Sequence, residues 1–236
     1  MGSDIAEVLA VGGFAVIPAA MPSNVVTRLL LLFEPDPNAM GGDAKGRYAM
    51  RNVAELIPEV RDVADGFTIR SLIDPILGRE AFLVRSLFFD KTARANWKVA
   101  WHQDRSIAVQ QRTEVAGFGP WSVKAGVAHV APPVATLEEM LTMRLHLDDC
   151  DESNGPLRVI PGSHLKGRLT ARQIRDEIAE RPQVSCPVAA GGVLLMRPLL
   201  LHASSPARPP RHRRVVHLEF ARSRLPDGLR WACEAR

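Results

Sequence analysis

A histidine and an aspartate stand two residues apart in the stretch Trp101–Asp104. If this stretch is a strand, alternate side chains point to the same face, so His102 and Asp104 project together. An imidazole and a carboxylate on one face suit a divalent metal of intermediate softness. Because such pairs also arise often by chance, a third ligand from elsewhere in the chain is needed.

His202 is the strongest candidate for that third ligand. It follows a predicted strand over 191–201 and precedes three small residues, 203–205. Two imidazoles and one carboxylate on one face of an octahedral metal leave three positions open, the arrangement of non-haem Fe(II) oxygenases. The other histidines, His129, His146, His164, His212 and His217, are expected by default to be structural or exposed, with His164 closing a turn.

Arg213 follows His202 with ten residues between them and opens a further predicted strand. A 2-oxo acid can chelate two of the three open metal positions, and O2 can take the third. The far carboxylate of such a cosubstrate then needs a rigid bidentate cation, which arginine supplies better than lysine. Arg213 is therefore the predicted partner of that carboxylate.

Three motifs in one order resemble the phytanoyl-CoA dioxygenase (PhyH-like) family. They are Trp101–Asp104, the run NGPLRVIPGSH over 154–164, and the histidine and arginine at 202 and 213. The resemblance runs from about 82 to 221, with a looser likeness over 12–18. It implies a double-stranded β-helix core (jelly-roll, cupin-like), Fe(II), O2, and oxidative decarboxylation of 2-oxoglutarate to succinate and CO2.

The resemblance also implies roles for single residues. It places the metal on His102, Asp104 and His202, and the 2-oxoglutarate carboxylate on Arg213, with Ser204 donating a hydrogen bond to the same carboxylate. Relatives that halogenate lack the metal-binding carboxylate, so that halide can bind. The presence of Asp104 therefore favours hydroxylation or a related oxidation.

The strand expected before Asp148 departs from the family pattern. Many relatives carry an aromatic and then a small residue on its inward face, whereas this chain has Arg144 and His146 there. If that face lines the site, a cation and an imidazole suit a polar or anionic substrate, with Arg144 beside the cosubstrate. The alternative is a buried ion pair of Arg144 with Asp148 or a glutamate. Trp121 and Lys91 are further candidates for substrate contact.

The elements that must hold these residues are predicted mainly as strands. Short apolar runs bounded by turn residues predict strands over 12–18, 82–90, 99–104, 108–111, 143–148, 157–160, 192–196 and 215–220. Helices are predicted over 23–33, about 69–77, and from a capping box at Thr170 to Glu180. Loops are expected over 35–46 and 113–133, and a two-residue hairpin turn at Asn154-Gly155.

This pattern predicts a mainly β fold with flanking helices. We expect a single domain over 1–236, with N-terminal support over about 1–80 and a jelly-roll core over about 82–221. The 236 residues, 46% hydrophobic and 24% charged, are ordinary for a globular domain of this size.

Composition argues against several other classes of protein. The net charge of +4 comes with mixed signs, and the basic stretch 208–214 lacks the aromatic motifs of nucleic-acid binders. Three widely spaced cysteines predict neither a disulfide framework nor a zinc knuckle. No apolar run reaches the roughly 20 residues of a membrane helix, and the acidic start does not resemble a secretory signal. We expect a cytoplasmic monomer or homodimer that acts on a small molecule.

Two alternatives remain open from the sequence. The chain could be a non-catalytic jelly-roll protein that binds a metal or ligand. It could also be a cupin-type metalloenzyme, such as an isomerase, that does not use 2-oxoglutarate. The position of Arg213 argues against both.

Overall fold

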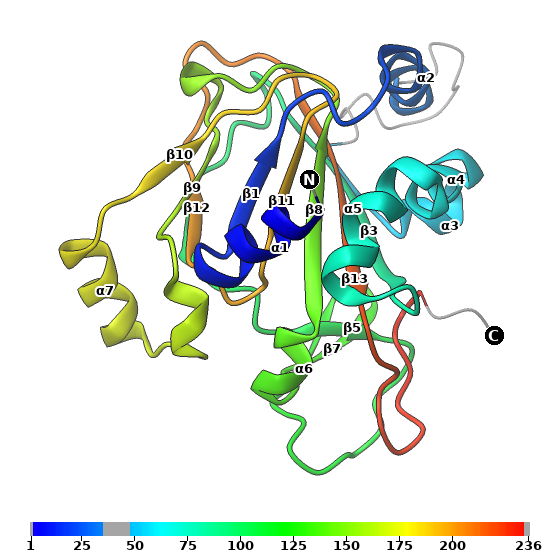
Figure 1. Cartoon of the computed structure of the whole chain (residues 1–236), viewed down its shortest axis with the longest axis vertical. Helices are drawn as coiled ribbons and strands as arrows, with labels where there is room; N and C mark the ends of the chain where they lie inside the picture. The colour runs from blue at the N-terminus through cyan, green and yellow to red at the C-terminus, as the bar shows by residue number, and fades with distance from the viewer. Residues whose placement is uncertain (1, 35–47, 234–236) are drawn as a thin grey trace.

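A computed structural model describes residues 2–34 and 48–233 (Figure 1). The strands are β1 Phe14–Ile17, β2 Ala49–Arg51, β3 Phe82–Lys91, β4 Val99–His102, β5 Ile107–Val109, β6 Trp121–Lys124, β7 Val127–Val130, β8 Met140–His146, β9 Leu157–Val159, β10 Val184–Cys186, β11 Val193–Met196, β12 His202–Ser204 and β13 Arg213–Ala221. The helices are α1 Gly2–Val11, α2 Ser23–Phe33, α3 Val53–Leu56, α4 Pro58–Asp65, α5 Phe67–Leu77, α6 Val134–Glu138 and α7 Ala171–Glu180, with short 3₁₀ turns at Glu152–Asn154 and Ser163–Lys166.

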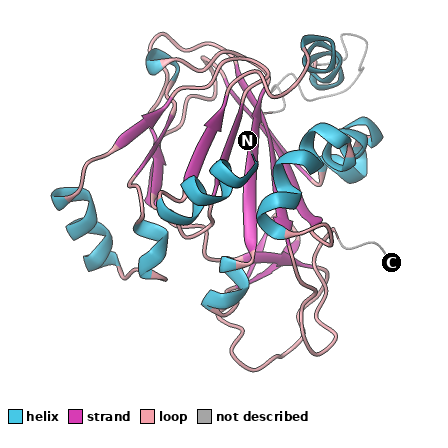
Figure 2. Ribbon diagram, in the orientation of Figure 1, coloured by secondary structure: helices cyan, strands magenta, loops and turns pink. Residues whose placement is uncertain are grey.

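The strands form three sheets in which every pairing is antiparallel. The largest has six strands in the order β1-β11-β8-β13-β3-β2, and the second has four in the order β10-β9-β12-β4. The third, β5-β7-β6, has three. Figure 2 shows strands at the centre and helices at the outside, which confirms the predicted mainly β fold with flanking helices.

The two faces of the six-stranded sheet have opposite character. On β8, Leu141, Met143 and Leu145 belong to the main hydrophobic core, whereas Arg144 points to the other face and lines an internal cavity. On β13, Leu218 belongs to the same core, and its neighbours on either side face that cavity. Alternation along each strand thus separates an apolar outer face from a polar inner face.

The helices of the N-terminal third cover the apolar outer face. Figure 1 shows α1 lying in front of β11 and α5 lying in front of β13. Along α5, Ile69, Ile73 and Leu77 recur every four residues and are buried, the spacing that places them on one helix face. Each such side chain contributes about 1.5–3 kcal/mol on burial, and together they shield the sheet from water.

The long loop expected over 113–133 is wrong, because this segment contains the hairpin of β6 and β7. Its two turn residues, Ala125 and Gly126, both have positive φ, at 50° and 79°. Positive φ at both central residues is the geometry of a tight hairpin turn, which usually carries Asn-Gly or Asp-Gly. Because alanine rather than Asn or Asp stands at the first turn position, the sequence does not indicate a hairpin turn there. The glycines and prolines before β6 indicated a loop instead.

The two-residue hairpin turn expected at Asn154-Gly155 is also wrong. Asn154 ends a 3₁₀ turn that Asp151 caps, its carboxylate accepting from the backbone of Ser153 at 2.9 Å and of Asn154 at 3.1 Å. Gly155 follows with φ of 63°, and a Cβ there would lie 2.3 Å from the carbonyl oxygen of Ser205. Glycine is required here because the Ser205 backbone approaches closely.

Other predicted elements are recovered, with shifted ends. The helix over 23–33 and the capping box at Thr170 are confirmed, whereas the strand expected over 99–104 ends at His102. The sequence reasoning missed α1, α3, α4, α6, β2, β10 and β12. The loop expected over 35–46 lies outside the described residues. Among the helices that the structure describes, none has the length and apolar character needed to cross a membrane.

Candidate metal centre

Strand pairing brings the two predicted histidine ligands together. β12 pairs with β4 so that His202 lies directly opposite His102, and the two ring centroids are 4.2 Å apart. Asp104 lies two residues beyond the end of β4, where its backbone N–H donates to the carbonyl of Pro198 at 2.9 Å. The contact with Pro198, rather than a continued strand, holds Asp104 on the same side as His102.

Gln103 anchors the backbone between the two candidate ligands from the opposite side. Its side chain is buried, and its amide donates to the carbonyls of Leu199 at 2.7 Å and Gly167 at 2.8 Å. Its carbonyl oxygen accepts from the N–H of Leu169 at 2.9 Å. A buried amide with its hydrogen-bonding capacity satisfied fixes the direction of the neighbouring side chains.

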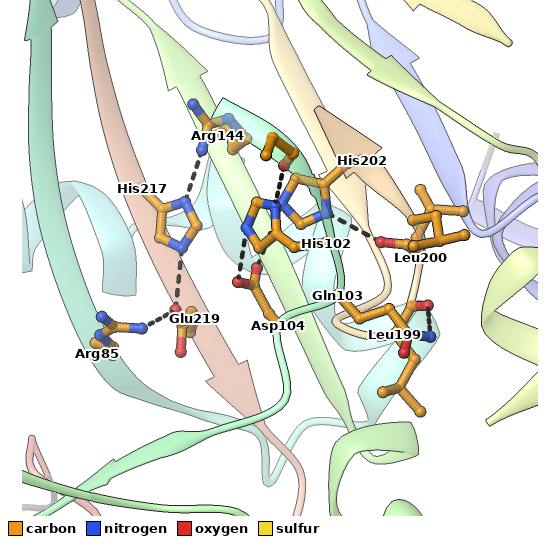
Figure 3. A network of polar contacts seen from close by, with 12 residues as sticks. Arg85, His102, Gln103, Asp104, Arg144, Leu199, Leu200, His202, His217 and Glu219 are labelled. Carbon is orange, nitrogen blue, oxygen red and sulfur yellow. Dashed lines mark hydrogen bonds and ion pairs between the residues drawn. The ribbon is translucent and has the colours of Figure 1, made fainter. Parts of the chain in front are cut away.

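The three candidate side chains present their ligand atoms to a common point (Figure 3). The carboxylate of Asp104 lies 3.7 Å from Nε2 of His102 and 3.8 Å from Nε2 of His202, and the three ligand atoms lie within 4.8 Å of one another. An ion bonded at about 2.0–2.2 Å to each of two atoms can span up to about 4.4 Å. Both distances therefore fit a shared ion.

Hydrogen bonds set the tautomer of both histidines. Nδ1 of His102 lies 2.8 Å from the carbonyl of Ala100, and Nδ1 of His202 lies 2.9 Å from the carbonyl of Leu200. Because a carbonyl only accepts, each Nδ1 carries the hydrogen, and each Nε2 lone pair is left for a metal. Metal-binding histidines in proteins are commonly oriented by such backbone contacts.

Electrostatics at the centre also favour a cation. Burial lowers the pKa of His202 to about 4, which keeps the ring in the neutral form that a metal requires. Burial alone would raise the pKa of Asp104, yet His202 and His102 hold it below its ordinary value. The carboxylate is therefore ionised, and it lies beside the neutral ring of His202.

A cavity of about 180 Å³ adjoins these side chains. It lies between the six-stranded and four-stranded sheets, since β3, β8 and β13 line one side and β4, β9 and β12 the other. Arg213, the first residue of β13, reaches it from one end and is only 5% exposed. The structure thus places the predicted carboxylate partner in the same cavity as the candidate metal ligands.

Ser204 joins Arg213 to a second cation, Lys91. The Ser204 hydroxyl accepts from the Arg213 guanidinium at 3.1 Å and from the Lys91 ammonium at 2.9 Å, and it can donate to the carbonyl of Gly155 at 3.0 Å. Arg213 also donates to Gly155. Lys91 is 1% exposed and donates to Ser205 as well, so it lies behind the cavity wall rather than in its opening.

Buried polar atoms around Arg213 fit an anionic cosubstrate. Nε of Arg213 and Nε of Arg144 are buried and find no hydrogen-bond partner within the described part of the chain, and both residues line the cavity. Buried polar groups without partners are costly and rare, and a carboxylate accepts from arginine with charge-assisted bonds. The donor set therefore fits 2-oxoglutarate at this end of the cavity.

Arg144 does not pair with Asp148, whose carboxylate binds Arg214 at 2.7 Å instead. The guanidinium of Arg144 lies 3.0 Å from Nδ1 of His217, and Nε2 of His217 lies 3.0 Å from the carboxylate of Glu219 (Figure 3). Since arginine only donates, Nδ1 accepts, and the hydrogen of His217 is on Nε2 and points to Glu219.

Arg85 completes this buried chain of side chains by donating to the same Glu219 oxygen at 2.8 Å. Sequence reasoning missed Arg85, His217 and Glu219 as cavity residues. The alternation along β13 carried the signal, because 213, 215, 217 and 219 share one face. His217 was instead expected to be structural or exposed.

The remaining predicted site residues lie elsewhere. Trp121 lines a neighbouring groove rather than the central cavity, with the Arg112 guanidinium 5.6 Å from its ring centroid. His146 is 3% exposed and does not line the cavity wall. His164 closes the turn after β9 as expected, with Nε2 lying 3.3 Å from the carbonyl of Ala10.

Comparison with known proteins extends this description. The family model for phytanoyl-CoA dioxygenase (PhyH) matches residues 12–215. The chain belongs to this family. No curated protein sequence matches the chain significantly.

Solved structures share the fold of this PhyH-family protein at low sequence identity. EctD from S. alaskensis in its apoform has a TM-score of 0.74 at 18% identity, covering 100% of this chain and 82% of that chain. The non-heme alpha ketoglutarate dependent carbocyclase SnoK has a TM-score of 0.67 at 17% identity, covering 94% of this chain and 84% of that chain. The epimerase SnoN in complex with Fe3+, alpha ketoglutarate and nogalamycin RO has a TM-score of 0.68 at 18% identity, covering 93% and 82%.

Proposed function

We propose that this PhyH-family protein is an Fe(II)- and 2-oxoglutarate-dependent dioxygenase that oxidises a small molecule. One observation carries the proposal: two histidine Nε2 atoms and one carboxylate converge beside a cavity that a buried arginine also lines. Similar structures support it, since SnoN is in complex with Fe3+ and alpha ketoglutarate and EctD is with 2-oxoglutarate.

In this proposal each group of residues has a distinct task. His102, Asp104 and His202 hold Fe(II), and Arg213, Ser204 and Arg144 hold 2-oxoglutarate. Iron and 2-oxoglutarate together supply O2 activation, with decarboxylation of the cosubstrate to succinate and CO2. The protein contributes a fixed donor geometry, a neutral His202 and a cavity between two sheets that excludes bulk water.

Hydroxylation is the proposed outcome, because Asp104 fills the ligand position that halogenating relatives leave free. The cationic lining of the cavity favours a polar or anionic small molecule as the substrate. Similar structures include an epimerase and a carbocyclase, so the fate of the substrate is the finer part of the proposal. All three cysteines are free thiols, which supports a cytoplasmic location.

Substitution of the candidate ligands tests the proposal. His102→Ala and Asp104→Ala should abolish iron-dependent succinate formation from 2-oxoglutarate, because each removes one of the three side chains that fix the position of the metal in this site. Circular dichroism should show an unchanged fold for both variants. Full succinate formation by either variant contradicts the ligand assignment. If the unsubstituted protein takes up no oxygen in the presence of Fe(II) and 2-oxoglutarate, a non-catalytic or cupin-type role is favoured instead.

A further inference from the structure

A second groove, of about 500 Å³, opens next to the candidate metal centre and has His102 in common with the central cavity. The hairpin of β6 and β7 forms one wall, through Trp121 and Lys124. The segment after β4 and the loop before α7 form the other, through Arg105 and Arg168. A molecule in this groove would therefore lie beside the exposed edge of His102.

The groove is lined by three cations and by no acidic residue. Arg105, Lys124 and Arg168 all line it. Lys124 donates to the hydroxyl of Ser106 at 2.9 Å, and Arg105 to the carbonyl of Leu169 at 3.4 Å, so their partners are neutral. Within the described residues, none of the three forms an ion pair with a carboxylate.

Arg168 is the residue that most needs a partner. Its Nε and Nη2 atoms are buried and lack a hydrogen-bond partner among the residues that the structure describes. Burial and the nearby positive charge of Arg105 lower its pKa. Two guanidinium groups that repel each other beside unpaired donors are stabilised by an oxyanion, which accepts charge-assisted hydrogen bonds from both.

The volumes of the central cavity and of the groove also favour the groove as the binding site of the substrate. Ligand pockets are ordinarily about 300–1,000 Å³, whereas the central cavity has only about 180 Å³. A cosubstrate at Arg213 would use much of that volume. The adjoining groove has the room for the body of a second molecule and reaches the metal centre at His102.

We propose that this groove binds an oxyanion group of the substrate, a phosphate or a carboxylate, through Arg105, Lys124 and Arg168. The reacting carbon then extends past His102 to the metal centre. This inference rests on the proposed function for its placement of the substrate, but the binding of an anion in the groove does not depend on turnover.

Calorimetric titration of the iron-free protein with inorganic pyrophosphate and with citrate tests the groove. The unsubstituted protein should bind at least one of the two at submillimolar concentration, and the preferred anion identifies the substrate group as a phosphate or a carboxylate. The double variant Arg105→Gln/Arg168→Gln should weaken that binding at least tenfold, and Lys124→Gln should weaken it less, because Lys124 is a single point charge.

Two control variants separate the groove from other cations. Arg172→Gln removes an exposed arginine of α7, whose side chain is 86% exposed, and should leave binding unchanged. Arg213→Gln should also leave it unchanged, because Arg213 lies in the central cavity. Equal binding by the double variant, loss of binding in Arg213→Gln, or no binding of either anion overturns the inference.

The same double variant distinguishes failure of the groove from failure of the proposed function. Its affinity for 2-oxoglutarate, measured with Mn(II) in place of iron, should match that of the unsubstituted protein. If neither protein binds 2-oxoglutarate, the proposed function fails. If both bind it while neither anion binds in the groove, only the present inference fails.

Discussion

At the scale of single residues, the candidate metal centre depends on where the hydrogens lie. The carbonyls of Ala100 and Leu200 take the Nδ1 hydrogens of His102 and His202. Both Nε2 lone pairs therefore point toward Asp104 before any ion arrives. Such preorganisation lowers the cost of assembling the site, because the rings do not have to change tautomer or orientation on binding.

Lys91 should make the binding of 2-oxoglutarate depend on pH. Burial and the nearby Arg213 lower its pKa to about 7. Below pH 7 the ammonium is already charged and attracts the dianion. Above pH 7 binding has to bring in a proton, so the dissociation constant should rise by up to about tenfold per pH unit.

Titration calorimetry at pH 6, 7 and 8 in buffers of different ionisation enthalpy measures this effect. Uptake of protons on binding is expected at pH 8 and not at pH 6. Lys91→Met should remove both the uptake and the slope. A dissociation constant that does not change from pH 6 to pH 8 in the unsubstituted protein contradicts the prediction.

His217 should act as a positioning residue for Arg144. It accepts a hydrogen bond from Arg144 and donates one to Glu219. His217→Phe removes both bonds, and the dissociation constant for 2-oxoglutarate should rise at least about tenfold, since a hydrogen bond to a charged group contributes roughly 1.5–3 kcal/mol.

His217→Gln provides the matched control, because its amide offers an acceptor oxygen and a donor nitrogen. It should keep the affinity within a few-fold of the unsubstituted protein. Melting temperatures of both variants show whether the fold survives. Unchanged affinity in a folded His217→Phe protein means that His217 does not position Arg144.

At the scale of elements, α7 supports the strand that delivers His202. Ile174 and Ile178 of this helix pack against a small core formed by Ile160, Leu169 and Leu201. The helix begins with a complete capping box. Loss of this helix would therefore weaken the packing next to β12, although α7 does not line the cavity.

Thr170→Ala should destabilise the protein while leaving 2-oxoglutarate binding unchanged. The Thr170 hydroxyl accepts from the backbone N–H of Gln173 at 3.3 Å, and loss of such a cap costs about 0.5–2 kcal/mol. For a domain of this size, a loss of 1 kcal/mol lowers the melting temperature by roughly 2–4 °C.

Differential scanning calorimetry measures the change. Gln173→Ala, which removes the reciprocal bond of the capping box, should also lower the melting temperature. A melting temperature for Thr170→Ala equal to that of the unsubstituted protein shows that the cap does not support the fold.

At the scale of the whole molecule, the two larger sheets enclose the cavity and the helices cover the outer face of one of them. Ligands that bind between the sheets therefore bind only the folded state. Mn(II) and 2-oxoglutarate, each at about 100 times its dissociation constant, should each stabilise the folded state by about 2.7 kcal/mol. Thermal unfolding with and without each ligand measures these increments.

Arg213→Gln separates the two increments. This variant should lose most of the stabilisation by 2-oxoglutarate and keep the stabilisation by Mn(II), because Arg213 lines the cavity but is not one of the candidate metal ligands. Loss of both increments, or of neither, contradicts the division of the cavity into a metal end and a cosubstrate end.

The sequence alone determined the residue types on which the site depends and the general class of the fold. The spacing of His102 and Asp104 and the later positions of His202 and Arg213 predicted one metal centre with one carboxylate partner. Short apolar runs bounded by turn residues predicted most strands of the two larger sheets. These signals are local in the chain, or belong to a family pattern, so they can be found without coordinates.

Only the tertiary structure decided which strands lie side by side and which face of each looks inward. The pairing of β12 with β4 sets His202 opposite His102. The pairing of β13 with β3 and β8 sets Glu219 opposite Arg85 and His217 opposite Arg144. The cationic groove likewise depends on the hairpin of β6 and β7, which the sequence did not predict because alanine stands at position 125 of the turn. Alternation along one strand tells which side chains share a face, but which strands pair depends on contacts between residues far apart in the chain.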